Sequence, residues 1–231
     1  MVTLLSQSIK ADDNKVVKTF KDIVPLTFGE EIGNAVSHGV AAFIALCALP
    51  YAAILSFLNF GIMGAFSVSV YVISIFLMFI SSTVYHSMPN KSSHKFILRI
   101  IDHSMIYVAI AGTYTPICLA LVGGWIGWSA MIVLWGITIW GILYKSLAKN
   151  VNHKLSLIMY LVMGWVGVLF LPKIIFDTSI TFMLFILFGG IAYTIGAWFY
   201  AQKDRPYFHM IWHFFIVIAS VFHFIAIIYF M

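Results

Sequence analysis

The sequence predicts an all-α integral membrane protein, a bundle of seven transmembrane helices. Of its 231 residues, 62% are hydrophobic and only 9% are charged, whereas soluble domains average about 45–50% apolar and about 25% charged residues. The apolar runs are long and uninterrupted, which favours helices over barrel strands, whose side chains alternate over about 10 residues. We expect one membrane domain over residues 31–231, preceded by a cytosolic polar tail, residues 1–30, without the apolar core of a signal peptide.

Seven apolar stretches are separated by polar, glycine-containing or proline-containing breaks. The stretch from Ile32 to Asn90 contains no Asp, Glu, Lys or Arg and has room for two spans of about 20 residues, with a break expected at 58–61. We expect Pro89 to end the second span, Pro172 to end the fifth, and the run 111–116 to kink the third. The fifth stretch is the shortest, so six helices are the competing count. The predicted spans are 33–57, 62–85, 100–121, 125–144, 155–171, 180–200 and 208–230.

The basic residues predict the orientation of this bundle. Twelve of the 13 Lys and Arg residues fall in the tail and in the loops after spans two, four and six, and only Lys173 falls on the other side. Because cytosolic loops are enriched in Lys and Arg, the N-terminus is expected in the cytosol and the C-terminus outside. The net charge of +5 is then explained by orientation. Membrane lipids, and not nucleic acid, are the expected partners.

Two pairs of side chains inside the predicted spans have helical spacing. His209 and His213 form an H-x-x-x-H pair, which projects both rings from one face of a helix and allows them to bind one metal ion. Taken alone, this pair is explained at least as well by hydrogen bonds between helices. Ser82 and His86 share the spacing at the end of the second span.

Asp102 is the only acidic residue between Ile32 and Leu171. An ionisable group in hydrocarbon is costly, which makes this position a candidate functional residue. The alternative is an ion pair with Arg99, three residues earlier on the same helix. Asp102 lies about 4.5 Å along the helix from Arg99, and His209 lies about 6 Å from Arg205. The candidate groups of spans two, three and seven therefore fall at similar depth near the cytosolic face.

These groups together predict a zinc site of the catalytic kind. Three His ligands with an open fourth position are typical of catalytic zinc, here His86, His209 and His213. Zinc lowers the pKa of a bound water to about 7. Asp102 could accept the proton of that water, and the Ser82 hydroxyl could orient it or donate to a developing oxyanion.

Other polar residues of the spans have supporting or structural interpretations. The first span opens with Glu31, Asn34 and His38 on one helical stripe, and these either brace the metal cluster or cap the helix. His103, beside Asp102, is counted with the supporting residues. His223 lies about 21 Å deeper than His209 and is expected to form an interhelical hydrogen bond.

Three motifs resemble those of the haemolysin III branch of the progestin and adipoQ receptor family, part of a superfamily of seven-helix membrane proteins that includes alkaline ceramidases. Residues 31–38, EIGNAVSH, fit the opening E-x-x-N-x-x-x-H; residues 82–86, STVYH, with Asp102 fit S-x-x-x-H…D; residues 209–213, HMIWH, fit the closing H-x-x-x-H. The run AGTYTP at 111–116 is similar to the bacterial members. The resemblance extends from about Glu30 to the end of the chain.

The resemblance implies a zinc ion bound by His86, His209 and His213, with a water held near Ser82 and Asp102. The favoured function is a zinc-dependent hydrolase in the plasma membrane, acting on an amide or ester lipid from the cytosolic leaflet and serving membrane lipid homeostasis. One alternative is a pore-forming cytolysin, although a pore requires polar groups through the full depth of the bilayer. The other is a non-catalytic membrane sensor in which a structural zinc joins spans two, three and seven.

Overall fold

The computed structural model describes residues 26–89, 92–148, 151–202 and 205–231, and over these ranges the chain is helical, without strands. Six helices in this part of the chain are long and apolar enough to cross a membrane. Most of the predicted tail, residues 1–25, lies outside the described residues, as do Lys91, Lys149 and Lys203. The elements are α2 (Phe28–His86), α3 (Ser93–Pro116), η1 (Ile117–Val122), α4 (Gly124–Leu147), α5 (His153–Trp165), η2 (Val166–Phe170), α6 (Leu171–Ile174), α7 (Ile180–Ala201), α8 (Phe208–Ile225) and η3 (Ala226–Phe230).

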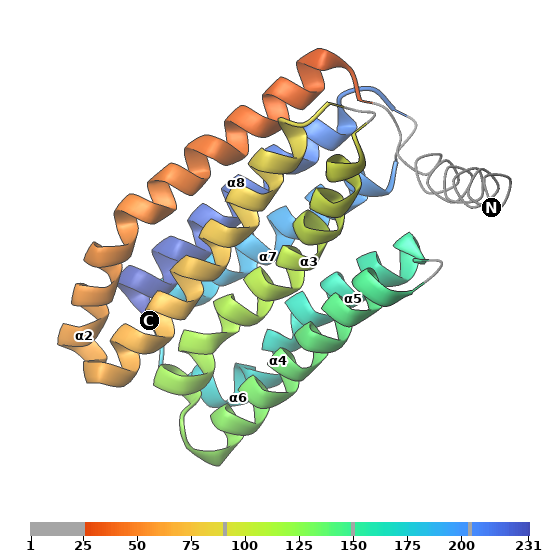
Figure 1. Ribbon diagram of the computed structural model, residues 1–231. Helices are drawn as coiled ribbons and strands as arrows, with labels where there is room; N and C mark the ends of the chain where they lie inside the picture. Colours follow the sequence, from red (N-terminus) through yellow and green to blue (C-terminus); the bar gives the residue numbers. More distant parts are fainter. Residues whose placement is uncertain (1–25, 90–91, 149–150, 203–204) are drawn as a thin grey trace, which may run out of the picture.

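Helix α2 is two helical arms joined at Gly61. This residue has φ 65° and ψ −154°, a conformation that glycine adopts without steric cost, so the predicted break at 58–61 is confirmed. Figure 1 shows the chain turning back on itself there, so that the two arms run side by side. The hairpin returns His86, the last residue of α2, to the level of its first turn, where Glu31 lies.

Helix α3 begins earlier than expected, and the predicted start at residue 100 is wrong. The Ser92 hydroxyl accepts a hydrogen bond from the His94 amide at 3.2 Å and caps a helix that starts at Ser93. Residues 93–99, placed in the loop after span two, therefore form the first turns of α3. At the other end, the α-helix gives way at Pro116 to the π-helix η1. The helices pack closely in this region, because a Cβ on Gly112 would lie 2.4 Å from the Ser74 side chain.

The fifth predicted span does not end at Pro172. Helix α5 passes into the 3₁₀-helix η2 and then into α6, whose first turn contains this proline. A proline is tolerated there because the amide groups of a first turn have no intrahelical partner. The fourth, sixth and seventh predicted spans agree with α4, α7 and α8 with η3 to within a few residues.

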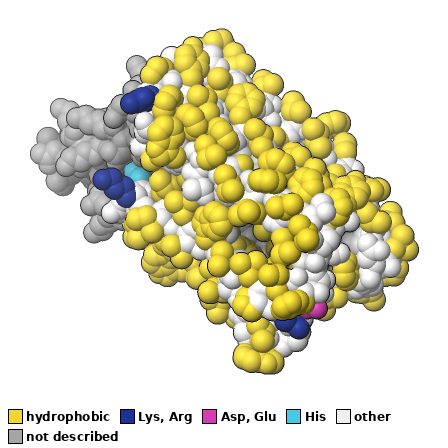
Figure 2. Space-filling view, turned by 180° about the vertical axis from the view of Figure 1, so that it is seen from behind, with side chains coloured by type: hydrophobic (Ala, Val, Ile, Leu, Met, Phe, Trp, Pro, Cys, Tyr) yellow, Lys and Arg dark blue, Asp and Glu magenta, His cyan; other side chains and the backbone are white. Residues whose placement is uncertain are grey.

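The helices pack so that several polar ends meet at one end of the bundle. α2 contacts α3 and α8, and α7 contacts α8. Both ends of α2 and the starts of α3 and α8 lie at this end (Figure 1). The face in Figure 2 is covered almost entirely by hydrophobic side chains, with charged ones near its two ends. Such a surface suits hydrocarbon and not water.

Candidate metal centre

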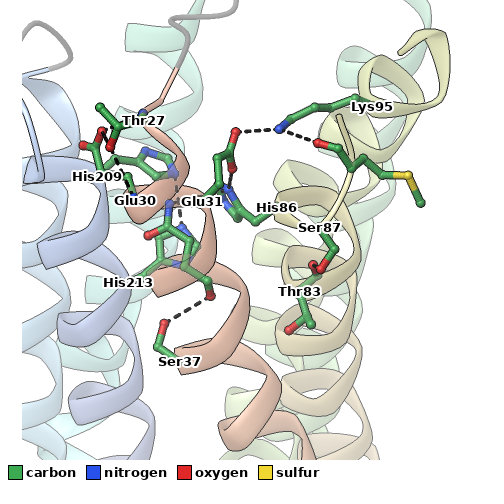
Figure 3. Close-up of polar contacts among 12 residues, drawn as sticks. Thr27, Glu30, Glu31, Ser37, Thr83, His86, Ser87, Lys95, His209 and His213 are labelled. Atoms are coloured by element: carbon green, nitrogen blue, oxygen red, sulfur yellow. Dashed lines mark hydrogen bonds and ion pairs between the residues drawn. The ribbon is translucent and has the colours of Figure 1, made fainter. Parts of the chain in front are cut away.

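The end of α2 and the first turns of α8 bring His86, His209 and His213 together (Figure 3). Each offers one ring nitrogen to a group in which all three atoms lie within 4.8 Å of one another. The ring centroids of His86 lie 5.3 Å from those of His209 and 4.8 Å from those of His213. The three histidines predicted as ligands are thus adjacent, and among the described residues they form the one group found that could hold a metal ion.

The chemistry of these nitrogens fits zinc. His86 Nε2 and His213 Nδ1 are buried and have no hydrogen-bond partner among the described residues. The Nε2 atoms of His209 and His213 lie 3.2 Å apart. Two nitrogens that each lie 2.0–2.1 Å from a tetrahedral zinc ion are separated by about 3.3 Å. The spacing of the two Nε2 atoms and the unpartnered Nε2 of His86 therefore suit a metal ion held by three imidazoles, and the unpartnered Nδ1 of His213 lies on the other side of its ring.

Glu31 braces His86, and the Asn34 side chain lies beside the same ring nitrogen. The Nδ1 atom of His86 lies 2.6 Å from Glu31 Oε2 and 3.5 Å from the Asn34 side-chain nitrogen. A carboxylate on the far nitrogen of a metal-binding imidazole fixes the ring and its tautomer. Of the two interpretations of this stripe, bracing is the one the geometry supports. Capping of α2 falls instead to Thr27 and Glu30, which form a capping box.

Ser82 and Asp102 lie on the α2–α3 side of the histidines. Ser82 is one helical turn before His86 and is 1% exposed. Asp102 on α3 is buried, interacts electrostatically with His86 and faces Ser82. Sequence spacing alone placed these two groups beside the histidines, and the structure brings them there.

His38 and His103, both predicted as supporting residues, have different surroundings. The His38 ring centroid lies 4.0 Å from that of His213, and neither of its ring nitrogens has a hydrogen-bond partner within the described ranges. His38 therefore borders the candidate centre. His103 is occupied elsewhere: its Nδ1 donates to the Arg99 carbonyl at 2.8 Å, and its Nε2 lies 3.2 Å from the Tyr200 hydroxyl.

Two charged residues of the centre were missed by the sequence reasoning. Lys95 was assigned to a loop, yet it is 0% exposed and forms an ion pair with Glu31. The Glu30 carboxylate accepts hydrogen bonds from the Thr27 amide at 2.9 Å and from the amide of Tyr207, the N-cap of α8, at 2.5 Å. A sequence signal was available only for Glu30, which forms a pair of acids with Glu31 immediately before a long stretch without charge.

An apolar cavity of about 220 Å³ lies inside the bundle, and the three histidines are not among the side chains that line it. Tyr200 and Trp212 line it, and their ring centroids lie 6.0 and 4.9 Å from that of His209. Its walls come mainly from α3, α5, α7 and α8, and His223 lines it further along α8. The rings of Tyr200 and Trp212 thus lie between the candidate centre and the cavity.

Fold and site define a multi-pass membrane protein with a buried histidine triad beside an apolar cavity. The chain matches the family model for haemolysin-III related proteins over residues 26–224. It is 35% identical over 205 residues to the hemolysin-3 homolog of Bacillus subtilis (strain 168), covering 88% of this chain and 95% of that protein. The protein belongs to the haemolysin III family. A multi-pass membrane protein of this bacterial family is consistent with location in the plasma membrane.

Two further relatives extend the comparison. Hemolysin-3 of Bacillus cereus is 32% identical over 201 residues, which is 87% of this chain and 91% of that protein. The human monocyte to macrophage differentiation factor is 28% identical over 210 residues, which is 86% of this chain and 83% of that protein. The similarity therefore covers nearly the whole described membrane domain in bacterial and animal relatives alike.

Proposed function

We propose that this protein is a zinc-dependent membrane hydrolase that cleaves an amide or ester lipid from the cytosolic leaflet and thereby contributes to membrane lipid homeostasis. The observation that carries the proposal is the convergence of three histidines, two of them with unpartnered buried nitrogens, with only the rings of Tyr200 and Trp212 between His209 and an apolar cavity. Zinc in such a site supplies Lewis acidity and an acidified water.

The residues around the histidines suit hydrolysis of a carbonyl compound. Asp102 accepts a proton from a water that adds to the carbonyl carbon, and it delivers this proton to the departing nitrogen or oxygen. The products are a carboxylic acid and an amine or alcohol. The Ser82 hydroxyl, which lies beside Asp102, donates to the carbonyl oxygen as negative charge develops there. The supporting observation is that both groups are buried beside His86.

The apolar cavity supports a lipid substrate. Its walls consist almost wholly of hydrophobic side chains from helices that face hydrocarbon, and Tyr200 and Trp212 connect it to the histidines. An acyl chain in this chamber would bring its carbonyl group to the polar end. A water-soluble substrate would gain little from binding in this cavity, because the apolar walls offer few hydrogen-bond partners.

The proposal includes seven spans and a cytosolic N-terminus. The six long helices of the described residues correspond to seven spans because α2 counts twice. Its 59 residues are far more than the roughly 20 that cross a bilayer, and each of its two arms forms one span. The described basic residues at the start of α3, the end of α4 and the starts of α5 and α8 lie at the end of the bundle with the triad (Figure 1). Their concentration there supports a cytosolic site.

The test begins with metal analysis of the purified full-length chain. We expect about one zinc per chain, and folded protein without bound metal under zinc-replete purification would contradict the proposal. The second measurement follows lipid composition by mass spectrometry after incubation with membrane lipids. Release of fatty acid by the wild type, and none by Asp102→Asn with its metal retained, is the expected result. Full metal occupancy without turnover of any lipid class would leave a structural zinc instead.

The name hemolysin-3, printed for bacterial relatives, suggests a cytolysin as the competing function. The polar groups described above gather at one end of the bundle, which does not favour a water-lined path. A dye-release assay on liposomes separates the two functions. We expect no leakage at any protein density, and leakage that rises with protein density would favour the pore.

A further inference from the structure

Lys95 is a charged side chain in an unusual place. It lies in the first turn of α3 and is 0% exposed, although it belongs to a polar run at the end of the bundle. Its Nζ atom lies 2.5 Å from Glu31 Oε1 and 2.9 Å from the Met88 carbonyl oxygen, and 5.2 Å from the ring centroid of Tyr85. Burial of an ammonium group costs several kcal/mol unless it is paired and hydrogen-bonded, so these contacts are required for its placement.

The partner of Lys95 is also the partner of a predicted metal ligand. Glu31 uses one carboxylate oxygen for each neighbour: Oε1 for Lys95, and Oε2 for His86 Nδ1 at 2.6 Å (Figure 3). A carboxylate only accepts hydrogen bonds, so His86 Nδ1 is the donor. In the neutral imidazole this contact places the proton on Nδ1 and leaves the lone pair on Nε2, which is the nitrogen without a partner among the described residues.

We propose that Lys95 is a positioning residue of the metal centre: it holds the Glu31 carboxylate in the orientation that fixes His86 with Nε2 facing the metal. This inference rests on metal binding, which is part of the proposed function. Without Lys95, the Glu31 side chain loses the contact that fixes Oε1, and the imidazole loses its fixed partner. Loss of such an outer partner of a ligand weakens metal affinity about 10–100-fold.

The alternative role for the same contacts is purely structural, a tie between the start of α2 and the start of α3. The two roles differ in what they couple. A structural tie lowers stability equally in metal-free and metal-loaded protein, and it leaves the metal environment as it was. A positioning role changes metal retention and the ligand field, and it acts only while Glu31 can accept from His86.

The experiment uses full-length protein in detergent, loaded with Co²⁺, and compares Lys95→Met, Lys95→Arg and the control Lys154→Met. Lys154 is an exposed lysine at the same end of the bundle, so its loss controls for the change in net charge. We expect Lys95→Met to release the metal to a chelator about 10–100-fold faster and to alter the visible Co²⁺ spectrum. Lys95→Arg, which keeps the charge, is expected to recover most of the retention, and Lys154→Met to match the wild type.

A double-variant cycle tests whether Lys95 acts through Glu31. In a Glu31→Gln background, Lys95→Met should have no further effect on metal release, because its target is already altered. Additive effects, or an unchanged spectrum and release rate in Lys95→Met, would overturn the inference while the proposed function stands. Absence of metal binding in the wild type would overturn both. If Lys95→Met does not fold, Lys95→Gln, which removes the positive charge and ends one bond short of the Nζ position, replaces it with the same expected direction.

Discussion

Helix α8 carries histidines in two settings, one at its start and one near its end. At the start, His209 and His213 meet His86, and one ring nitrogen in each of His86 and His213 has no hydrogen-bond partner in the described chain. Near the end, the Nε2 atom of His223 lies 3.2 Å from the Ile186 carbonyl oxygen on α7, so the expected interhelical hydrogen bond is confirmed. The Nδ1 atom of His223 likewise has no partner among the described residues, so residue type and an unpartnered nitrogen are shared by both regions. Convergence of several imidazoles is what separates a candidate metal site from a helix–helix contact.

The largest expected effect separates the two regions by metal content. His209→Ala should reduce bound zinc from about one per chain to near zero, because two imidazoles do not replace a three-histidine site. His223→Ala should retain the full content, and so should His94→Ala, which removes an exposed histidine at the same end of the bundle. Elemental analysis of purified protein measures all three. Equal zinc loss in His223→Ala and His209→Ala would remove the distinction.

The second prediction separates binding from chemistry within the first region. Asp102→Asn keeps the shape of the buried side chain but cannot accept a proton. Turnover should fall about 10²–10⁴-fold while zinc content stays at the wild-type level. Lipid mass spectrometry and elemental analysis on the same samples provide both values. Loss of metal together with activity would instead make Asp102 part of the metal-binding structure.

The third prediction concerns packing in the second region. A Cβ on Gly189 would lie 2.2 Å from the Cδ2 atom of His223, so Gly189→Ala should destabilise the protein by about 1–3 kcal/mol without changing zinc content. Denaturant unfolding in detergent measures the loss. The double variant Gly189→Ala/His223→Ala should recover part of it, since the clashing ring is gone. No recovery would mean that the strain lies in the backbone contact of α7 and α8.

The smallest expected effect tests how the first region is joined. Glu30→Gln weakens the carboxylate contacts to the amides of Thr27 and Tyr207, which join the start of α2 to the N-cap of α8. We expect a loss of about 1 kcal/mol in unfolding free energy. Zinc should be released somewhat faster, because His209 lies two residues after Tyr207. The matched variant Thr27→Ala loses only the α2 cap, so equal zinc release in both variants would contradict this role for Glu30.

The three histidines of the candidate metal centre could be predicted to lie together because polar residues are rare in apolar spans. His86, His209 and His213 stand out by helical spacing and by similar distance from basic loops, and both signals are local. Lys95 could not be found in this way, because a lysine in a polar run is normally a solvated one. Its burial results from α3 starting at Ser93 and from the return of α2, which places Glu31 within reach. Such contacts depend on tertiary geometry that no short window of sequence contains.

Pro172 and Ser92 show the same limit at helix ends. A proline is a strong stop signal within a helix, but a weak one where a new helical turn begins, as it does in α6. A serine in a polar run is equally consistent with a loop and with an N-cap, and only the amide of His94 decides between them. The helical, membrane-spanning kind of each apolar segment was therefore easier to predict than where each begins.

The reversal of α2 at Gly61 limits how the gene for this chain can change in length. Glu31 and His86 lie on opposite arms of the hairpin and must meet across 55 positions. One residue added within either arm would rotate everything beyond it by about 100° and shift it by about 1.5 Å along the axis, turning His86 away from α8. Insertions and deletions should therefore be tolerated around the bend, where the helical phase is already broken, and selected against in both arms.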